Sequence, residues 1–235
     1  RARSWSLTQL RPCPTNVTSG AGARVFFVPK AHDACAGELL VICNPPAGSV
    51  LPVGTNTVVC SATDHAGNNN QCSFIVTVLG ALTSKLAVLN EIEGEITDGG
   101  APGFNRAVGR LRRSVDPKHW LDEIPLNSAG ATVFWNDAAA MRILSRALRQ
   151  HTDDIPDESL KDWMDRLVAI DRVLATTKID EATRSGASAT ALDAAARNLN
   201  RGDRARDSQH PVTAILSYLR AWRAAARAER RSQNH

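Results

Sequence analysis

The chain has 235 residues, of which 43% are hydrophobic and 22% are charged, and these proportions are ordinary for a folded protein rather than a disordered one. A chain of this length accommodates one large or two modest domains. The formal net charge of +4 is too small to indicate a nucleic-acid partner by itself, and without an apolar run of about 18 residues no membrane span is expected.

All five cysteines lie in the first third of the chain: Cys13, Cys35, Cys43, Cys60 and Cys72. Cysteines gathered in one small segment predict a disulfide framework in an oxidising compartment. A zinc site is the alternative. Zinc ligands favour closely spaced Cys pairs, whereas the spacings here are 22, 8, 17 and 12 residues, so the pattern favours disulfides.

Residues 10–79 have the pattern of β-strands. Short apolar runs occupy 24–28 and 39–43, and apolar residues alternate with polar ones over 57–63 and 72–78. Turn signals separate the strands, the clearest being Asn44-Pro45-Pro46 and Asp64-His65-Ala66-Gly67-Asn68. Several short strands with regular turns predict a sandwich, and its core of about 70 residues is thin enough to benefit from covalent staples.

Residues 82–232 have a helical period, because apolar side chains recur there at three- and four-residue spacing. The stripes are Leu82, Leu86, Leu89 and Ile96; Phe104, Val108 and Leu111; Met141, Leu144 and Leu148; Leu160, Trp163, Leu167, Ile170 and Leu174; Leu192, Ala195, Ala196 and Leu199; and Ile215, Leu219 and Trp222.

Local signals predict where several of these helices begin and end. They are a cap at Asn136-Asp137, a start at Pro156 with Asp153-Asp154 at its positive end, a stop near Gly202 and a start at Pro211. The period changes at 79–83. The sequence therefore predicts a multidomain β + α chain: a small β-sandwich over 10–79, then an all-α bundle of five or six helices over 82–232.

One group of motifs in the β segment resembles a known family. The motifs are Pro46-Ala47-Gly48-Ser49, Pro52-Val53-Gly54-Thr55, Ala62-Thr63-Asp64 with Ala66-Gly67-Asn68, and Cys72-Ser73-Phe74-Ile75-Val76-Thr77-Val78, preceded by Cys13-Pro14 and Ala31-His32-Asp33. Together they resemble the hyalin repeat, or HYR, domain over about residues 11–78. The resemblance implies an immunoglobulin-like sandwich of extracellular proteins that serves adhesion. It implies no catalytic residues.

The resemblance also implies a disulfide pairing. In an immunoglobulin-like sandwich the first and last strands run side by side, which would bring Cys13 near Cys72, and Cys43 would meet Cys60. Relatives with a cysteine near Cys35 often carry a second one near 22–23, where this chain has none. Cys35 is therefore expected to be a free thiol, or to pair with another chain.

The helical half more loosely resembles the C-terminal helical segments of large bacterial surface proteins, for which no activity is implied. The resemblance depends on 115–120, on 167–174, and on Ala214-Ile215 with Tyr218, Ala221 and Trp222.

Motifs of familiar enzymes are absent: the chain has no nucleophile-elbow, phosphate-loop, HExxH or dinucleotide-binding pattern. Asp64, His65 and Asn68 could hold calcium, but a turn-forming Asp explains them more simply, because hard cations want several oxygen ligands. Arg201-Gly202-Asp203 is a tripeptide that some adhesion receptors recognise, although at a helix end a Gly with flanking charges is ordinary. We expect no metal and no cofactor.

Five arginines near the C-terminus are the candidate anion-binding residues: Arg220, Arg223, Arg227, Arg230 and Arg231. Their spacing puts several on one helix face, where they could meet phosphate, anionic lipid or acidic polysaccharide. A solvated face on a terminal helix is the alternative, because no aromatic stacking platform accompanies them.

We expect a non-catalytic adhesion or interaction module at the C-terminus of a larger secreted or cell-surface protein. The start at Arg1 rather than Met indicates a fragment, so neighbouring domains of the longer chain are expected partners, besides an extracellular protein or polysaccharide. Two alternatives stay open: an accessory region of a secreted enzyme whose catalytic domain lies upstream, and binding of anions through the arginines.

Overall fold

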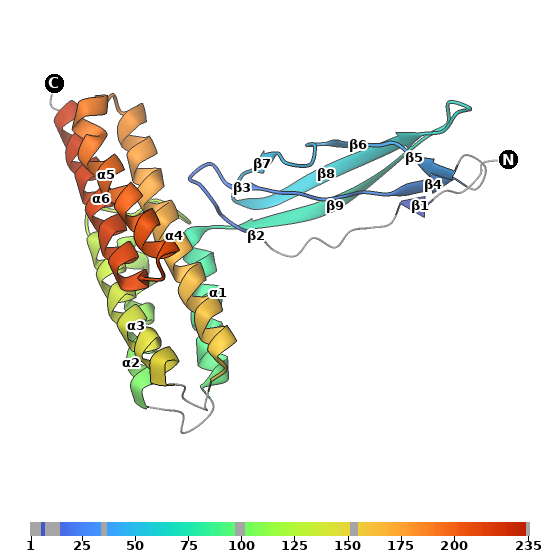
Figure 1. Ribbon diagram of the computed structural model, residues 1–235. Helices are drawn as coiled ribbons and strands as arrows, with labels where there is room; N and C mark the ends of the chain where they lie inside the picture. The colour runs from blue at the N-terminus through green and yellow to red at the C-terminus, as the bar shows by residue number, and fades with distance from the viewer. Residues whose placement is uncertain (1–5, 8–14, 34–36, 97–101, 151–154, 234–235) are drawn as a thin grey trace. The chain divides into compact units, whose positions relative to one another are not determined.

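A computed structural model describes residues 6–7, 15–33, 37–96, 102–150 and 155–233. The strands and helices separate into two compact units (Figure 1). The β unit ends at Gly80, and the helical unit comprises 81–235 together with Thr18–Gly20. This order, a β domain followed by a helical bundle, confirms the predicted fold class.

In the described part of the β unit, nine strands form three sheets (Figure 1). They are β1 (Ser6–Leu7), β2 (Thr15–Asn16), β3 (Ala23–Arg24), β4 (Ala31–Asp33), β5 (Gly37–Leu39), β6 (Val41–Asn44), β7 (Val50–Leu51), β8 (Gly54–Thr63) and β9 (Asn69–Leu79). The largest sheet has the order β2-β9-β8-β6, and the others are β1-β4-β5 and β3-β7. In chain order, β2 is the first strand of the largest sheet and β9 is the last. These two strands pair in parallel, as expected for an immunoglobulin-like sandwich.

Alternation along β8 and β9 sets the inner face of the large sheet. Val58 pairs with Phe74 and Asn56 with Val76, so the buried Val58 and Val76 lie on the same face of neighbouring strands. The ring of Phe74 meets that of Phe27 edge to face, with centroids 5.1 Å apart. The strand predicted over 24–28 is shorter than expected, because β3 comprises only Ala23–Arg24.

The predicted turn between β8 and β9 is confirmed. One carboxylate oxygen of Asp64 accepts hydrogen bonds from the backbone N–H groups of Ala66, at 2.9 Å, and Asn68, at 2.8 Å. The other accepts from the Asn68 side chain at 2.7 Å. These bonds hold the pKa of Asp64 below its usual value, led by the side-chain bond from Asn68. Asp64 therefore stabilises the hairpin through its side chain.

The described part of the helical unit has six α-helices and one short 3₁₀ turn, Pro117–His119. The helices are α1 (Ala81–Glu95), α2 (Pro102–Ser114), α3 (Ala131–Gln150), α4 (Asp157–Arg184), α5 (Ala189–Asp207) and α6 (Pro211–Ser232). The stripes predicted for α2 and α4 are confirmed as buried, and Pro211 opens α6 as expected. No helix in the described ranges combines the length and apolar character needed to cross a bilayer.

The predicted inner face of α1 is correct for Leu89 but wrong for Leu86. Leu86 is exposed, and the buried side is formed by Ala81, Ser84, Lys85, Val88, Leu89 and Ile92. The predicted apolar stripe did not include Lys85, whose side chain is only 1% exposed because two carboxylates on other helices neutralise it. One of them, Asp137, was predicted to cap α3 together with Asn136. That prediction is also wrong, since α3 begins at Ala131 and both residues lie within it.

The predicted stop at Gly202 is wrong as well, because α5 continues to Asp207. Gly202 is buried, and a Cβ built there would overlap the ring of Tyr218 on α6. Glycine is therefore needed at this position because two helices approach closely, and the helix ends only at the Ser208 cap.

Candidate functional site

Three charged side chains form a buried cluster inside the helical unit. The Lys85 ammonium on α1 donates to Asp137 on α3 and, at 2.7 Å, to Asp171 on α4. Each of the three is at most 1% exposed. One oxygen of each carboxylate, Oδ1 of Asp137 and Oδ2 of Asp171, has no hydrogen-bond partner in the described residues. A site closed to solvent in this way cannot admit a substrate, so we assign the cluster a structural role.

Burial and charge act in opposite directions within this cluster. Burial, followed by the charge of Asp137, raises the pKa of Asp171 well above its usual value and favours its protonated form. Burial also opposes the charge on Lys85, but the attraction of Asp137 and Asp171 outweighs that effect, so the pKa of Lys85 is raised. The ammonium is thus held in its charged state by carboxylates from two other helices.

A second polar cluster joins α4, α5 and α6. The Arg172 guanidinium donates to both carboxylate oxygens of Asp203, at 2.7 and 3.1 Å, and the Tyr218 hydroxyl donates to the same group at 2.9 Å. Although burial raises the pKa of Asp203, the bonds from Arg172 and Tyr218 outweigh it and the pKa is lowered. With Gly202 packed on the Tyr218 ring, the tripeptide Arg201-Gly202-Asp203 is part of a helix–helix contact and not an exposed adhesion loop.

The five predicted anion-binding arginines are all exposed on α6: Arg220, Arg223, Arg227, Arg230 and Arg231. None of them forms an ion pair with another described residue, while the single acid of the helix, Glu229, binds Lys178 at 2.6 Å. The Arg223 guanidinium lies 5.8 Å from the centre of the Trp135 ring on α3, so an aromatic partner that the sequence did not reveal accompanies at least one arginine.

Further basic residues lie on α3, which packs against α6, and on α2, which packs against α3. In α3, Arg142, Arg146 and Arg149 are exposed, and the one acid, Asp137, is buried. In α2, Arg106, Arg110, Arg112 and Arg113 are exposed and no acid is present. The ends of α3 and α6 enclose a pocket of about 320 Å³, lined in part by Arg142, Arg146, Arg149 and the first residues of α6. We call the exposed arginines of α2, α3 and α6 the basic face.

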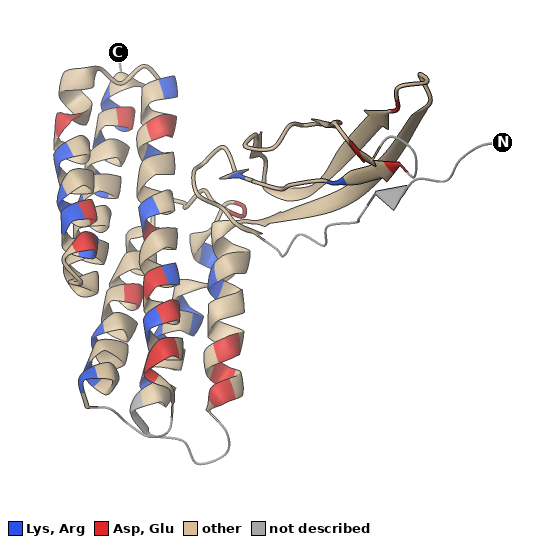
Figure 2. Cartoon of the chain, turned by 45° about the vertical axis from the view of Figure 1, so that its right-hand side comes forward, with Lys and Arg blue, Asp and Glu red and all other residues tan. Residues whose placement is uncertain are grey.

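The β unit carries little charge by comparison (Figure 2). Between residues 15 and 79 the only Lys, Arg, Asp and Glu are Arg24, Lys30, Asp33, Glu38 and Asp64. No group of three or more potential metal ligands occurs in the described ranges. The carboxylate of Asp64, considered as a calcium ligand, is engaged by the backbone and side chain of its own turn.

Apolar side chains instead cover much of the outside of the β unit. On the outer face of the large sheet, Ile42 pairs across from Ser61, Val59 from Ser73, and Ile75 from Thr57. Ile42, Val59 and Ile75 are therefore diagonal neighbours on β6, β8 and β9, and Ile42 is 67% exposed. Phe26, Val28 and Leu40 are exposed by more than 70%. We call these six residues the apolar outer surface.

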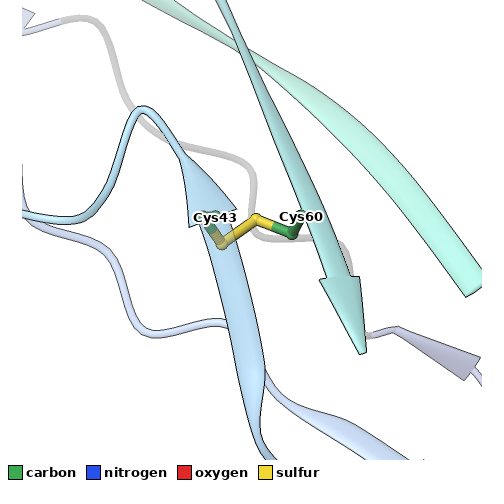
Figure 3. The surroundings of a disulfide bond; sticks show 2 residues. All are labelled: Cys43 and Cys60. Atoms are coloured by element: carbon green, nitrogen blue, oxygen red, sulfur yellow. A yellow bond between two sulfur atoms is a disulfide. The ribbon is translucent and has the colours of Figure 1, made fainter. Parts of the chain in front are cut away.

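The cysteines occupy the opposite, inner side of the large sheet. Cys43 on β6 lies directly opposite Cys60 on β8, and the two form a disulfide with Cα atoms 4.0 Å apart (Figure 3). The predicted Cys43–Cys60 bridge is confirmed. Cys60 in turn lies directly opposite Cys72 on β9, which is half-buried and forms no disulfide with another described cysteine. Cys13 and Cys35 lie outside the described residues, so the Cys13–Cys72 bridge and the free thiol at Cys35 stay predictions.

The family model of the HYR domain matches residues 12–78. This segment is a HYR domain. The match confirms the resemblance seen in the turn and strand motifs, and it ends one residue before β9 does. HYR domains are extracellular modules of the adhesion type and are not catalytic. No solved structure matches the chain.

The HYR match contains the disulfide and most of the β unit, but the six helices α1 to α6 lie outside it. The two polar clusters of the helical unit therefore have no family assignment. Sequence patterns missed both, because each joins residues from three helices that are distant along the chain.

Proposed function

We propose that the chain is a non-catalytic adhesion or interaction module of a secreted or cell-surface protein, and that the apolar outer surface of its HYR domain binds a protein partner. The observation that carries this proposal is the row of exposed Ile42, Val59 and Ile75 on neighbouring strands, together with the few charges of the domain. Contiguous apolar patches are uncommon on soluble proteins unless another molecule covers them. The adhesion-type family of the domain supports the same conclusion.

Capture of surface and culture-medium proteins of the source organism on the immobilised chain tests this function. The variant replaces Ile42, Val59 and Ile75 with Thr, which suits a strand but removes apolar area. The control replaces Ser61 and Ser73 on the same face with Thr. Proteins retained by wild type and control but not by the variant support the proposal. Equal retention by all three, or absence of the protein from every exported fraction, contradicts it.

In this proposal the module belongs to a larger exported protein. The coding sequence on either side of the chain tests that point. A hydrolase domain encoded upstream would favour the alternative in which the chain is an accessory region of a secreted enzyme.

A second candidate function is binding of an acidic polysaccharide through the basic face. It is favoured by the arginines of α6, which lack carboxylate partners among the described residues, and by Arg142, Arg146 and Arg149 beside them. Guanidinium groups bind carboxylate and sulfate oxygens with charge-assisted hydrogen bonds.

Retention on heparin, used as a model acidic polysaccharide, tests the second function. Replacing Arg220, Arg223 and Arg227 with Gln should shift elution to lower salt. Replacing Arg197, Arg201 and Arg204 on α5, which removes the same charge from exposed positions elsewhere, should shift it much less. Equal shifts would mean that only net charge matters and would contradict a defined site.

A further inference from the structure

The pocket between α3 and the start of α6 carries a concentration of positive charge. Arg142, Arg146 and Arg149 line it, and their spacing of four and three residues puts them on one face of α3. None of the three pairs with a carboxylate of a described residue, and no acid from the described ranges lines the pocket. The negative end of α3 attracts Arg149 in the last turn, but that effect does not reach back to Arg142, about two turns earlier.

The first turn of α6 adds backbone donors to the same pocket. Pro211 opens the helix without an N–H, and His210 before it supplies no side-chain cap. Among the described residues, the N–H groups of Val212 and Thr213 meet no acceptor, although both residues line the pocket. The start of a long helix is partially positive, and its unpaired N–H groups bind phosphate and sulfate oxygens. The helix start and the arginines therefore attract the same kind of ligand.

A buried hydroxyl without a partner also belongs to this pocket. The Oγ atom of Ser145 is buried, and no described residue forms a hydrogen bond with it. A serine within a helix commonly donates to the carbonyl four residues earlier, as Ser217 does to Thr213 at 2.8 Å. Ser145 makes no such bond and lines the pocket between Arg142 and Arg149. Because an unpaired buried hydroxyl is costly, a ligand oxygen would supply its missing partner.

Gln209 approaches the pocket from the turn between α5 and α6. Its N–H donates to the carbonyl of Arg206 at 2.9 Å, and the N–H of His210 donates to that of Ala205 at 2.8 Å, which is the pattern of a Schellman cap. The φ of Gln209 is 59°, in the left-handed region where glycine is the usual residue. Glutamine is strained there, but unlike glycine it brings a side-chain amide that can donate to a ligand in the pocket.

We propose that this pocket binds one tetrahedral oxyanion, a phosphate or sulfate group carried by a small ligand. Its volume of about 320 Å³ is at the lower end of the range of about 300–1,000 Å³ for ligand sites, which suits a small group. A tetrahedral anion directs its oxygens apart, so it can accept from guanidinium groups on α3 and from N–H groups on α6 at the same time. We call the site the oxyanion pocket, and its binding residues are Arg142, Ser145, Arg146, Arg149, Val212 and Thr213.

The oxyanion pocket goes beyond both candidate functions. All of its residues belong to the helical unit, so it does not depend on the apolar outer surface of the HYR domain. It holds a single anionic group at the start of α6, whereas a polysaccharide would extend along the helix. Arg220, Arg223 and Arg227, which the polysaccharide test replaces, do not line it.

Isothermal titration calorimetry of the full chain with sodium phosphate, and separately with sodium sulfate, tests the site. Sodium chloride keeps the ionic strength constant, so that exposed charges are screened equally throughout. We expect saturable binding of one ion per chain. Tighter binding of phosphate would assign the pocket to a phosphate ester, and tighter binding of sulfate would assign it to a sulfate ester. Sodium acetate, whose anion is planar and singly charged, should bind about tenfold more weakly.

The pocket variant replaces Arg142 and Arg146 with Gln. It removes two charge-assisted hydrogen bonds and should weaken phosphate binding by about tenfold or more. The matched control replaces Arg227 and Arg230 with Gln, which removes the same charge about 24 Å or more from the start of α6. The control should change the affinity by less than about twofold. All four arginines are exposed, so both variants should unfold at the wild-type temperature when phosphate is absent.

A second variant, Ser145→Ala, tests the geometry of the pocket without changing the net charge. Loss of a hydrogen bond to an anion should weaken phosphate binding by about fivefold. Because no described residue bonds this hydroxyl, its removal should not lower the unfolding temperature.

Three results would overturn the proposal. They are the absence of saturable binding with either ion, equal weakening in the pocket variant and its arginine control, and an unchanged phosphate affinity in Ser145→Ala. Failure of the polysaccharide candidate would look different, because replacing Arg220, Arg223 and Arg227 would then leave heparin retention unchanged while phosphate still bound in the titration.

Discussion

The ammonium of Lys85 lies 2.7 Å from a carboxylate oxygen of Asp171, although 86 residues separate them in the chain, and neither side chain is more than 1% exposed. With Asp137 as the second acceptor, this contact ties the first, third and fourth helices together in their common core. A buried charge is tolerated only when it is paired, so each member depends on the others.

Replacing Lys85 with Met should therefore destabilise the helical unit. Methionine fills similar space but leaves Asp137 and Asp171 buried without their counter-charge, and breaking such a cluster costs about 3–5 kcal/mol. Urea unfolding measured by circular dichroism checks this value. Lys161→Met on the exposed side of α4 is the control and should change the free energy of unfolding by less than about 0.5 kcal/mol. Similar losses in both variants would show that Lys85 is not specially paired.

The two carboxylates should respond differently to replacement by Asn. Because the pKa of Asp171 is raised well above its usual value, Asn resembles the protonated form that burial favours there. Asp171→Asn should then cost less stability at neutral pH than Asp137→Asn, which removes the counter-charge of Lys85. Thermal unfolding of the two variants checks the order, and a larger loss for Asp171→Asn would contradict it.

Stability should also depend on pH through Asp171. The folded protein binds this proton more tightly than the unfolded chain, so ionisation opposes folding. The free energy of unfolding should fall as pH rises above the ordinary Asp value of about 3.9 towards the raised folded pKa. The difference between wild type and Asp171→Asn, measured by urea unfolding at about pH 4 and about pH 7, isolates this contribution. A difference that is the same at both values would contradict it.

Gly202→Ala should destabilise the contact between α5 and α6. The added methyl would overlap the Tyr218 ring, and overpacking of this kind costs about 1–3 kcal/mol. Gly109→Ala on α2, where a Cβ meets no other atom within 4 Å, is the control and should stabilise by about 0.5–1 kcal/mol. Opposite signs in calorimetric unfolding confirm the prediction, and a stabilised Gly202→Ala variant would show that the two helices can separate without loss.

Replacing both Cys43 and Cys60 with Ala should weaken the HYR domain by about 2–4 kcal/mol, because the bridge restricts the unfolded chain. The loss should appear as a lower midpoint of urea unfolding, followed through the circular-dichroism signal of the β-strands. An unchanged midpoint would mean that the sheet register, rather than the bridge, supplies this stability.

The sequence predicted elements whose evidence is local. Alternation marked β8 and β9, and the motif around Asp64 identified both the turn and the HYR family. The stripe of Phe104, Val108 and Leu111 was also correct, because apolar spacing along one helix directly reports its buried side.

The errors in the helical unit concern residues whose environment is set by another helix. Lys85 and Asp137 are charged, and an apolar pattern assigns charged residues to the surface unless their partners are known. Gly202 looks like a helix stop until the Tyr218 ring is placed against it. The apolar outer surface was not predicted either, because alternation shows which residues share a face but not whether the second face is covered.

The single bridge across β6 and β8 has a mechanical consequence for a chain that is pulled from its two ends. The 17 residues from Cys43 to Cys60 cannot lengthen while the bond holds, which withholds about 60 Å of contour length from extension. Reduction of this bond should therefore lengthen the force–extension trace of the unfolded domain by about 60 Å.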